Sequence, residues 1–128
     1  MANLPSQPVT FSITNIYSVT NLTATGVPAV KYVPRDLAGN IIDFSVGTWT
    51  ASLLYLAPNG VNPNVTPSQA MTVALADATG ITIQMTEAQS TALCTGMSGP
   101  TTTGQITVTD GTNTVIVASG NITNKVIP

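Results

Sequence analysis

The sequence predicts an all-β fold, namely an antiparallel β-sandwich of seven to eight strands with one short helix near residues 86–94. Short runs alternate apolar and polar residues at period two, which is the pattern of half-buried strands. Glycine, proline, asparagine and aspartate separate these runs at the spacing expected of a sandwich. One capping-box pattern, Thr86 followed by Gln89, marks the start of a helix. An immunoglobulin-like and a jelly-roll-like arrangement both fit.

The N-terminal part holds an arm and the first strands. Residues 1–8 contain two prolines and few apolar groups, which predicts an extended arm ahead of a single domain over residues 9–128. Residues 9–13 alternate apolar with hydroxyl side chains and indicate a strand. A second strand over residues 29–33 lies between two prolines, so we expect it near a sheet edge. After the turn "LAGN", the run "IIDF" is expected to resume β structure.

The middle of the chain combines a core strand with a long loop. Trp49, Ala51, Leu53 and Tyr55 fall on one face of the run "TWTASLLYLAP", so Trp49 is interpreted as a core aromatic. Prolines, asparagines and a glycine then break the pattern, which predicts an irregular loop over residues 58–68.

The C-terminal part is expected to contain two hairpins and the helix. The runs "MTVALAD" and "ITIQM" flank the turn "ATG", and Asp110-Gly111 between two β-rich runs is a strong hairpin signal. Ser119-Gly120 interrupts the last run and suggests a bulge. The helix has room for about two turns before Gly96 and is too short to be stable alone. We therefore expect it to cross between sheets and plug one end, packing through Ala88, Ala92 and Leu93.

Composition points to binding rather than chemistry. Charged residues make up 6% of the chain, against roughly 25% in an average soluble protein. The net charge of −2 gives no field that would steer nucleic acid or a membrane surface. A surface of Thr, Ser, Asn, Gln and Gly costs little to desolvate, so it suits coverage by neighbouring subunits. A neutral polar monomer is the alternative interpretation.

The residue types argue against an enzyme. There is no histidine, which removes the commonest general base and metal ligand. Cys94, the single cysteine, has no base near it in sequence and is expected to be a small core hydrophobe. Asp36 and Asp43 are a formal carboxylate pair, but a better explanation is that Asp36 begins the turn "DLAGN" and Asp43 ends the short strand after it. Asp77 and Asp110 each precede a glycine-containing turn and are expected to cap it. We expect no catalytic, metal or cofactor site.

The order of elements resembles a known family. The strand "DFSVGTWTASL", the segment "ADATGITIQMTEAQSTAL" and the hairpin "GQITVTDGTNTVIVASGNIT" are similar to a small β-sandwich domain of tailed-phage structural proteins. The domain that the chain resembles is the N-terminal domain of upper baseplate proteins, and it is also found in short stand-alone virion proteins. The resemblance covers roughly residues 41–128. It departs at residues 115–120, where the family usually carries an arginine, and the baseplate proteins' long C-terminal extension is absent.

The resemblance implies a virion protein that is made in the host cytoplasm and binds other virion proteins, either major capsid or tail proteins, and copies of itself. Length, the missing extension and the neutral surface favour capsid decoration. A tail, neck or baseplate adaptor is the alternative, and a receptor- or carbohydrate-binding adhesin, using Tyr17 and Tyr32 as platforms, is the third. The predicted contact residues are in the arm and the loop: Leu4, Pro5, Gln7, Pro8, Pro58, Asn59, Pro63, Asn64 and Pro67.

Overall fold

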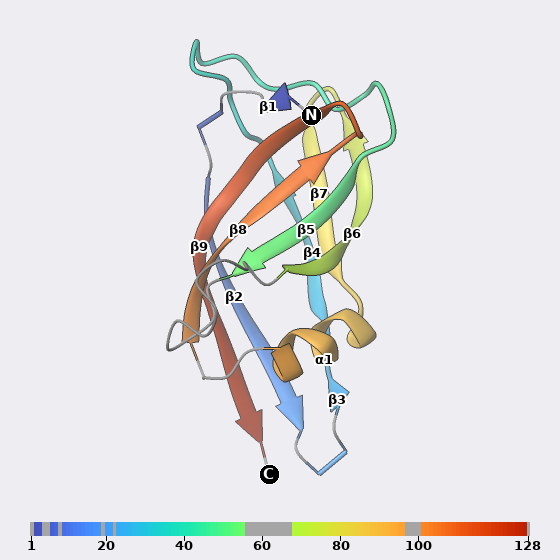
Figure 1. The fold of residues 1–128 in the computed structure, drawn as a ribbon, viewed down its shortest axis with the longest axis vertical. Coiled ribbons are helices and arrows are strands. Elements are labelled where there is room, and N and C mark those ends of the chain that lie inside the picture. Colours follow the sequence, from blue (N-terminus) through green and yellow to red (C-terminus); the bar gives the residue numbers. More distant parts are fainter. Residues whose placement is uncertain are drawn as a thin grey trace.

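The computed structural model describes residues 2–3, 6–7, 9–18, 20–21, 23–55, 68–96 and 101–127. Within these ranges the chain forms nine strands and one helix (Figure 1). In chain order these are β1 (Ala2–Asn3), β2 (Val9–Ser18), β3 (Thr23–Ala24), β4 (Val27–Tyr32), β5 (Thr50–Tyr55), β6 (Ser68–Asp77), β7 (Gly80–Met85), α1 (Glu87–Gly96), β8 (Thr101–Thr109) and β9 (Asn113–Ile127). The all-β prediction is confirmed, and seven of the described strands are six residues or longer.

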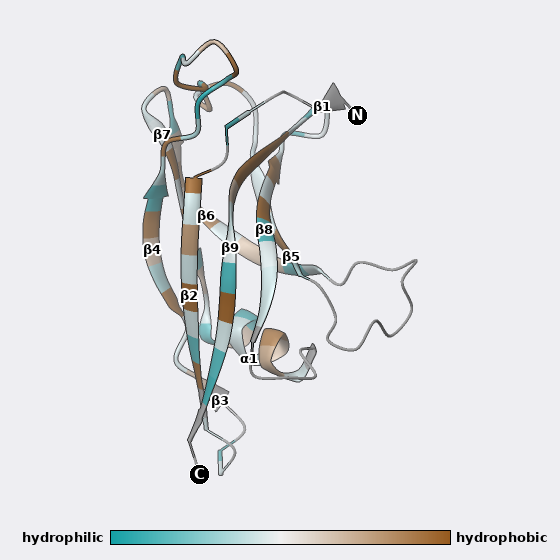
Figure 2. Ribbon diagram, turned by 90° about the vertical axis from the view of Figure 1, so that its left-hand side faces the viewer, coloured by the Kyte–Doolittle hydropathy of each residue, from teal (hydrophilic) through white to brown (hydrophobic). Residues whose placement is uncertain are grey.

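The strands form one mixed sheet in the order β3-β2-β9-β8-β5-β6-β7-β4, and β1 pairs with β9 outside this order. The two ends of the order, β3 and β4, are joined by only two residues, so the sheet curls until it nearly closes (Figure 2). β6 links two halves, because residues 68–71 pair with β5 and residues 72–77 pair with β7.

Two pairings differ from the antiparallel prediction. β2 runs parallel to β9 over ten residue pairs, from Val9–Ala118 to Ser18–Ile127, and β1 is also parallel to β9. The remaining described pairs are antiparallel. Alternation at period two is the same in both kinds of ladder, so the sequence pattern could not distinguish them.

The core fills the space inside the curled sheet. Alternate residues of β5, β7, β8 and β9 point into it, and Leu53, Ile81, Ile106, Val108, Val115 and Ile122 are completely buried. Trp49 is buried as predicted, packs edge-on against Phe44 with 5.0 Å between ring centroids, and donates from Nε1 to the carbonyl oxygen of Val46. Full burial of side chains of this size stabilises the fold by about 1.5–3 kcal/mol each.

The run "IIDF" is not a strand, contrary to the prediction. Ile41 makes only an isolated bridge to Arg35, and the chain then turns. Phe44 is drawn into the core, while the Asp43 carboxylate accepts a hydrogen bond from the Ser45 amide at 2.8 Å. The edge prediction for residues 29–33 is confirmed, because β4 lies at one end of the sheet order.

The predicted capping box starts α1. The Gln89 amide donates to Thr86 Oγ1 at 3.2 Å, and the Thr86 amide donates to Gln89 Oε1 at 3.0 Å. The helix joins β7 to β8, two strands separated by β5 and β6 in the sheet order, and packs against β3, β6, β2 and β7. It lies in the lower half of Figure 1, where β2, β9 and β3 extend beyond it. Leu93 is buried as expected, but Ala88 and Ala92 are exposed. The inward face instead carries Ser90, which is completely buried.

Candidate functional site

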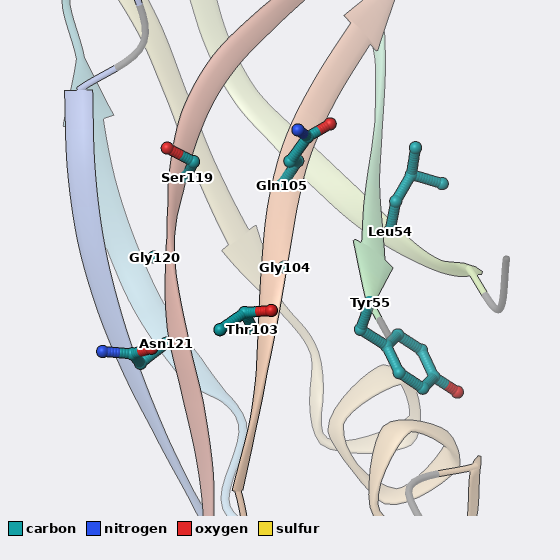
Figure 3. Close-up of a pocket in the computed structure, with 8 residues that line it drawn as sticks. All are labelled: Leu54, Tyr55, Thr103, Gly104, Gln105, Ser119, Gly120 and Asn121. Atoms are coloured by element: carbon teal, nitrogen blue, oxygen red, sulfur yellow. The ribbon is translucent and has the colours of Figure 1, made fainter. Parts of the chain in front are cut away.

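A hollow of about 560 Å³ lies on the outside of β5, β8 and β9 (Figure 3). Its volume falls within the usual range of small-molecule sites. Four polar side chains and two glycines from β8 and β9 form one part of the lining, and two side chains from β5 form the other. The lining residues are Leu54, Tyr55, Thr103, Gly104, Gln105, Ser119, Gly120 and Asn121.

Two glycines shape the floor of the hollow. Gly104 and Gly120 are register partners in the β8–β9 ladder. A Cβ on Gly104 would lie 2.7 Å from the carbonyl oxygen of Leu54, and one on Gly120 would overlap the carbonyl oxygen of Phe11 in β2. Only glycine allows β8 to approach β5, and β9 to approach β2, this closely. The sheet can therefore curve tightly at this point.

A bulge in β9 turns the polar side chains of this strand outward. The β8–β9 register shifts between Ile106 and Thr107, because Ile106 pairs with Ala118 whereas Thr107 pairs with Ile116. Val117 and Ala118 are consequently both buried, and the alternation is reversed after them. Ser119 and Asn121 thus face outward, with the bulge slightly earlier than predicted.

The four polar side chains of the hollow are free to bind. Thr103, Gln105, Ser119 and Asn121 are all exposed, and their side chains make no hydrogen bond to any described residue. They lie in two register pairs, Gln105 with Ser119 and Thr103 with Asn121. Two hydroxyls and two amides thus offer both donors and acceptors.

The hollow is electrically neutral. None of its lining residues carries a charge, and burial raises the pKa of the Tyr55 hydroxyl, so this group stays protonated near neutral pH. Leu54 is half-buried and gives the polar floor an apolar border on β5, whereas Tyr55 is almost completely buried and packs with the core. Such an arrangement can bind and orient a ligand, but it contains no group that titrates near neutral pH.

The uncharged surface continues across the ladder onto β2. Thr10 pairs with Ser119 and Ser12 pairs with Asn121, and both β2 side chains are exposed. The outward positions of β2, β9 and β8 beside the hollow are thus occupied by hydroxyl and amide groups. Lys125, two outward positions beyond Asn121 on β9, is the nearest charged residue along these strands.

Four aspartates cap turns in the β4–β5, β6–β7 and β8–β9 connections, and these connections lie at the top of Figure 1. Hydrogen bonds hold the pKa of three of these carboxyl groups below the usual value. Asp43 accepts from the side chain and backbone of Ser45, and Asp77 accepts from the side chain and backbone of Thr79. Asp110 accepts from the backbone amides of Asn113 and Thr112. The fourth, Asp36, accepts from two backbone amides of its own turn. Turn capping therefore accounts for all four, as predicted for Asp36, Asp77 and Asp110, whereas Asp43 does not end a strand as predicted. Over the residues placed by the structure, no group of three or more potential metal ligands is found.

A polar cluster is buried where α1 meets β2 and β9. Asn15 Nδ2 donates to the Ser90 carbonyl at 2.9 Å and to Cys94 Sγ at 3.0 Å, and Cys94 Sγ donates to Asn124 Oδ1 at 3.4 Å. Burial raises the pKa of the Cys94 thiol, although the hydrogen bond from Asn15 opposes this. Cys94 is half-buried among polar groups, rather than the core hydrophobe predicted.

The predicted contact residues fall mostly outside the described residues. Leu4, Pro5, Pro8, Pro58, Asn59, Pro63, Asn64 and Pro67 belong to this group. Gln7 is exposed, but it is fixed to the loop between β4 and β5: its amide donates to the Arg35 carbonyl at 2.7 Å and its side chain to the Asp36 carbonyl at 2.9 Å. Ser6 Oγ also donates to the Ile116 carbonyl, so the described part of the arm lies against the domain.

Tyr32, proposed as an exposed platform for an adhesin, is buried, and the side chain of Tyr17 lies outside the described residues.

The sequence patterns did not predict the hollow. The available signal was a glycine beside alternating polar residues in both "TTTGQ" and "ASGN", the two segments that the β8–β9 hairpin brings together.

Fold and site together define an all-β protein with an uncharged hollow on its outer face. No protein-family model, curated protein or solved structure matches the chain. The one helix within the described residues, α1, is not long and apolar enough to span a membrane.

Proposed function

We propose that this chain is a non-enzymatic structural protein of a virion, and that it decorates the capsid by binding the particle surface. The observation that supports this proposal is the outer face of β2, β9 and β8, which carries no charge beside the hollow and a single lysine, Lys125, farther along β9. Exposed hydroxyl and amide groups lose far less hydration energy than ions when a neighbour covers them. Weak contacts made by such a face are sufficient on a symmetric shell, because many copies bind at once.

The finer fold proposal is a sandwich of the immunoglobulin-like kind. The pairing supports it, since β2, β9, β8 and β5 would form one layer and β6, β7 and β4 the other, with β6 crossing between them. A parallel first and last strand in one layer is compatible with a sandwich that is otherwise antiparallel.

The decisive measurement is the copy number of the chain in purified particles, determined by mass spectrometry against isotope-labelled peptides. Hundreds of copies per particle are expected of a decoration protein. About six or twelve copies, the numbers set by the symmetry of a tail or neck, would favour the adaptor alternative. Absence from purified particles would refute the virion proposal.

A charge placed on the outer face tests which surface binds. We expect Ser12→Asp to reduce incorporation into particles, because covering the new carboxylate costs hydration energy that the serine does not lose. Ala74→Asp is the matched control, since residue 74 is exposed on the part of β6 that pairs with β7, and β6 pairs with none of the three strands of that face. Equal incorporation of both variants would show that the face of β2, β9 and β8 is not the contact surface.

A further inference from the structure

We propose that the hollow on β5, β8 and β9 is a binding site for a neutral oligosaccharide, held through Thr103, Gln105, Ser119 and Asn121. This inference goes beyond the proposed function. The site lies on the domain itself and does not depend on any role in a particle.

The backbone around the hollow excludes recognition by strand addition. β9 is paired with β2 and β8, β8 with β9 and β5, and β5 with β8 and β6. The three strands are therefore internal in the sheet order, and every lining residue except Thr103 and Tyr55, which have a described ladder partner on one side only, is paired on both sides. A peptide that binds by extending a sheet needs a free edge, which this position does not offer. Recognition must come from side chains.

The side chains offer what a polyhydroxylated ligand needs. Each hydroxyl of a sugar both donates and accepts a hydrogen bond, and the Thr, Ser, Asn and Gln side chains here also provide both. The register pairs Gln105–Ser119 and Thr103–Asn121 place these groups at the corners of a grid. In a regular sheet such a grid measures about 4.8 Å across the strands and about 6.8 Å along them.

The charge pattern selects a neutral ligand. The chain contains three basic residues (two lysines and one arginine) and five acidic residues, and none of these eight lines the hollow. An anionic sugar, a phosphate or a sulfate would lose its hydration without meeting a compensating charge. A neutral sugar loses less on entering and regains hydrogen bonds from the uncharged floor.

The border on β5 completes the site. Leu54 and Tyr55 come from the strand beside β8, on the opposite side of the floor from Ser119 and Asn121 (Figure 3). A sugar ring has an apolar face of C–H groups as well as its hydroxyls. Apolar surface beside a few convergent polar groups is the usual composition of a small-molecule site, and here both lie within one hollow of about 560 Å³.

The first test is a titration of the isotope-labelled chain, followed by NMR through the backbone amides of Gly104 and Gly120. The probes are neutral oligomers of glucose, galactose, mannose and N-acetylglucosamine, with sialylated and sulfated oligosaccharides for comparison. The proposal expects shifts of the two glycine amides with at least one neutral probe and none with the anionic probes. No response to any neutral oligomer at millimolar concentration would overturn it, as would a preference for the anionic probes.

A double variant provides the second test. Gln105→Ala with Asn121→Ala removes two exposed side chains, one from each register pair, and the expected loss of affinity is about tenfold or more. Thr10→Ala, on the exposed face of β2, is the matched control and should change affinity by less than about twofold. Circular dichroism verifies that both variants are folded. Sugar binding unaffected by the double variant would overturn the assignment.

The competing occupant is a second copy of the chain. Sedimentation velocity of the wild type and the double variant examines this possibility in the same samples. A wild-type dimer that the double variant abolishes, without any glycan response, would assign the hollow to self-association and overturn the proposal. A sedimentation coefficient that does not differ between wild type and variant, together with the glycine shifts, supports it.

Discussion

Replacing Ser90 by alanine should stabilise this protein, although the residue is completely buried. Ser90 lies on the inward face of α1 and is 0% exposed, and its Oγ has no hydrogen-bond partner among the described residues. A buried hydroxyl without a partner costs about 1–3 kcal/mol of desolvation. Alanine removes this cost, and its higher helix propensity contributes about 0.5 kcal/mol more.

The opposing effect is the loss of a few van der Waals contacts, worth about 0.1–0.2 kcal/mol each. We therefore expect Ser90→Ala to raise the free energy of unfolding by about 1–2 kcal/mol. For a chain of this length, that corresponds to an increase in Tm of about 4–8 °C. Urea unfolding followed by circular dichroism measures the change, and the urea dependence of the unfolding free energy should be the same in both proteins.

Thr95→Ala is the matched control, because Thr95 is exposed on the same helix and its hydroxyl bonds only to the Ala92 carbonyl. This variant should change the free energy of unfolding by about 0.5 kcal/mol or less. If Ser90→Ala were to destabilise the protein by about 1 kcal/mol while Thr95→Ala did not, the Ser90 hydroxyl would be hydrogen-bonded in the folded state and the reasoning would be wrong.

Three further predictions concern the cap, the floor of the hollow and the turns. Thr86→Ala removes one half of the capping box and should lower the free energy of unfolding by about 1 kcal/mol, as measured by urea unfolding. Gly120→Ala should cost about 3 kcal/mol or more, since its Cβ would overlap the Phe11 backbone; Gly39→Ala, at φ +92 with no atom within 4 Å, should cost only about 1–2 kcal/mol. Stability should also fall in acid, because the pKa of three carboxyl groups is lower in the folded state than in the unfolded state, where it is near 3.8. These groups stabilise the fold above the unfolded-state pKa, and this stabilisation is lost as the pH falls through the folded-state pKa. A thermal scan from pH 6 to pH 2 measures this loss, and a constant Tm below pH 4 would contradict the role assigned to Asp43, Asp77 and Asp110.

Local signals in the sequence predicted the local structure well. The capping box at Thr86 and the hairpin at Asp110-Gly111 depend on residues that are neighbours along the chain, and both are present. The burial of Trp49 and Leu53 follows from period-two alternation within one strand. In each case, interactions within about four residues determine the outcome.

Features that depend on distant residues were missed. The hollow needs Gly104 beside Gly120 and a reversal of alternation at Val117, so it exists only once the β8–β9 register is known. The inward face of α1 carries Ser90 rather than Ala88 because the helix packs over the polar side chain of Asn15. The pattern of a single segment contains no information about either partner.

The parallel pairing of β2 with β9 has a mechanical consequence. Because the two strands run in the same direction, a pull at residue 9 and an opposite pull at residue 127 act along the ladder from its two ends. Ten register pairs then carry the load in shear, and the hydrogen bonds must break together rather than one after another as in a zipper. The pairing of the first and last long strands therefore makes this domain resistant to stretching along that axis.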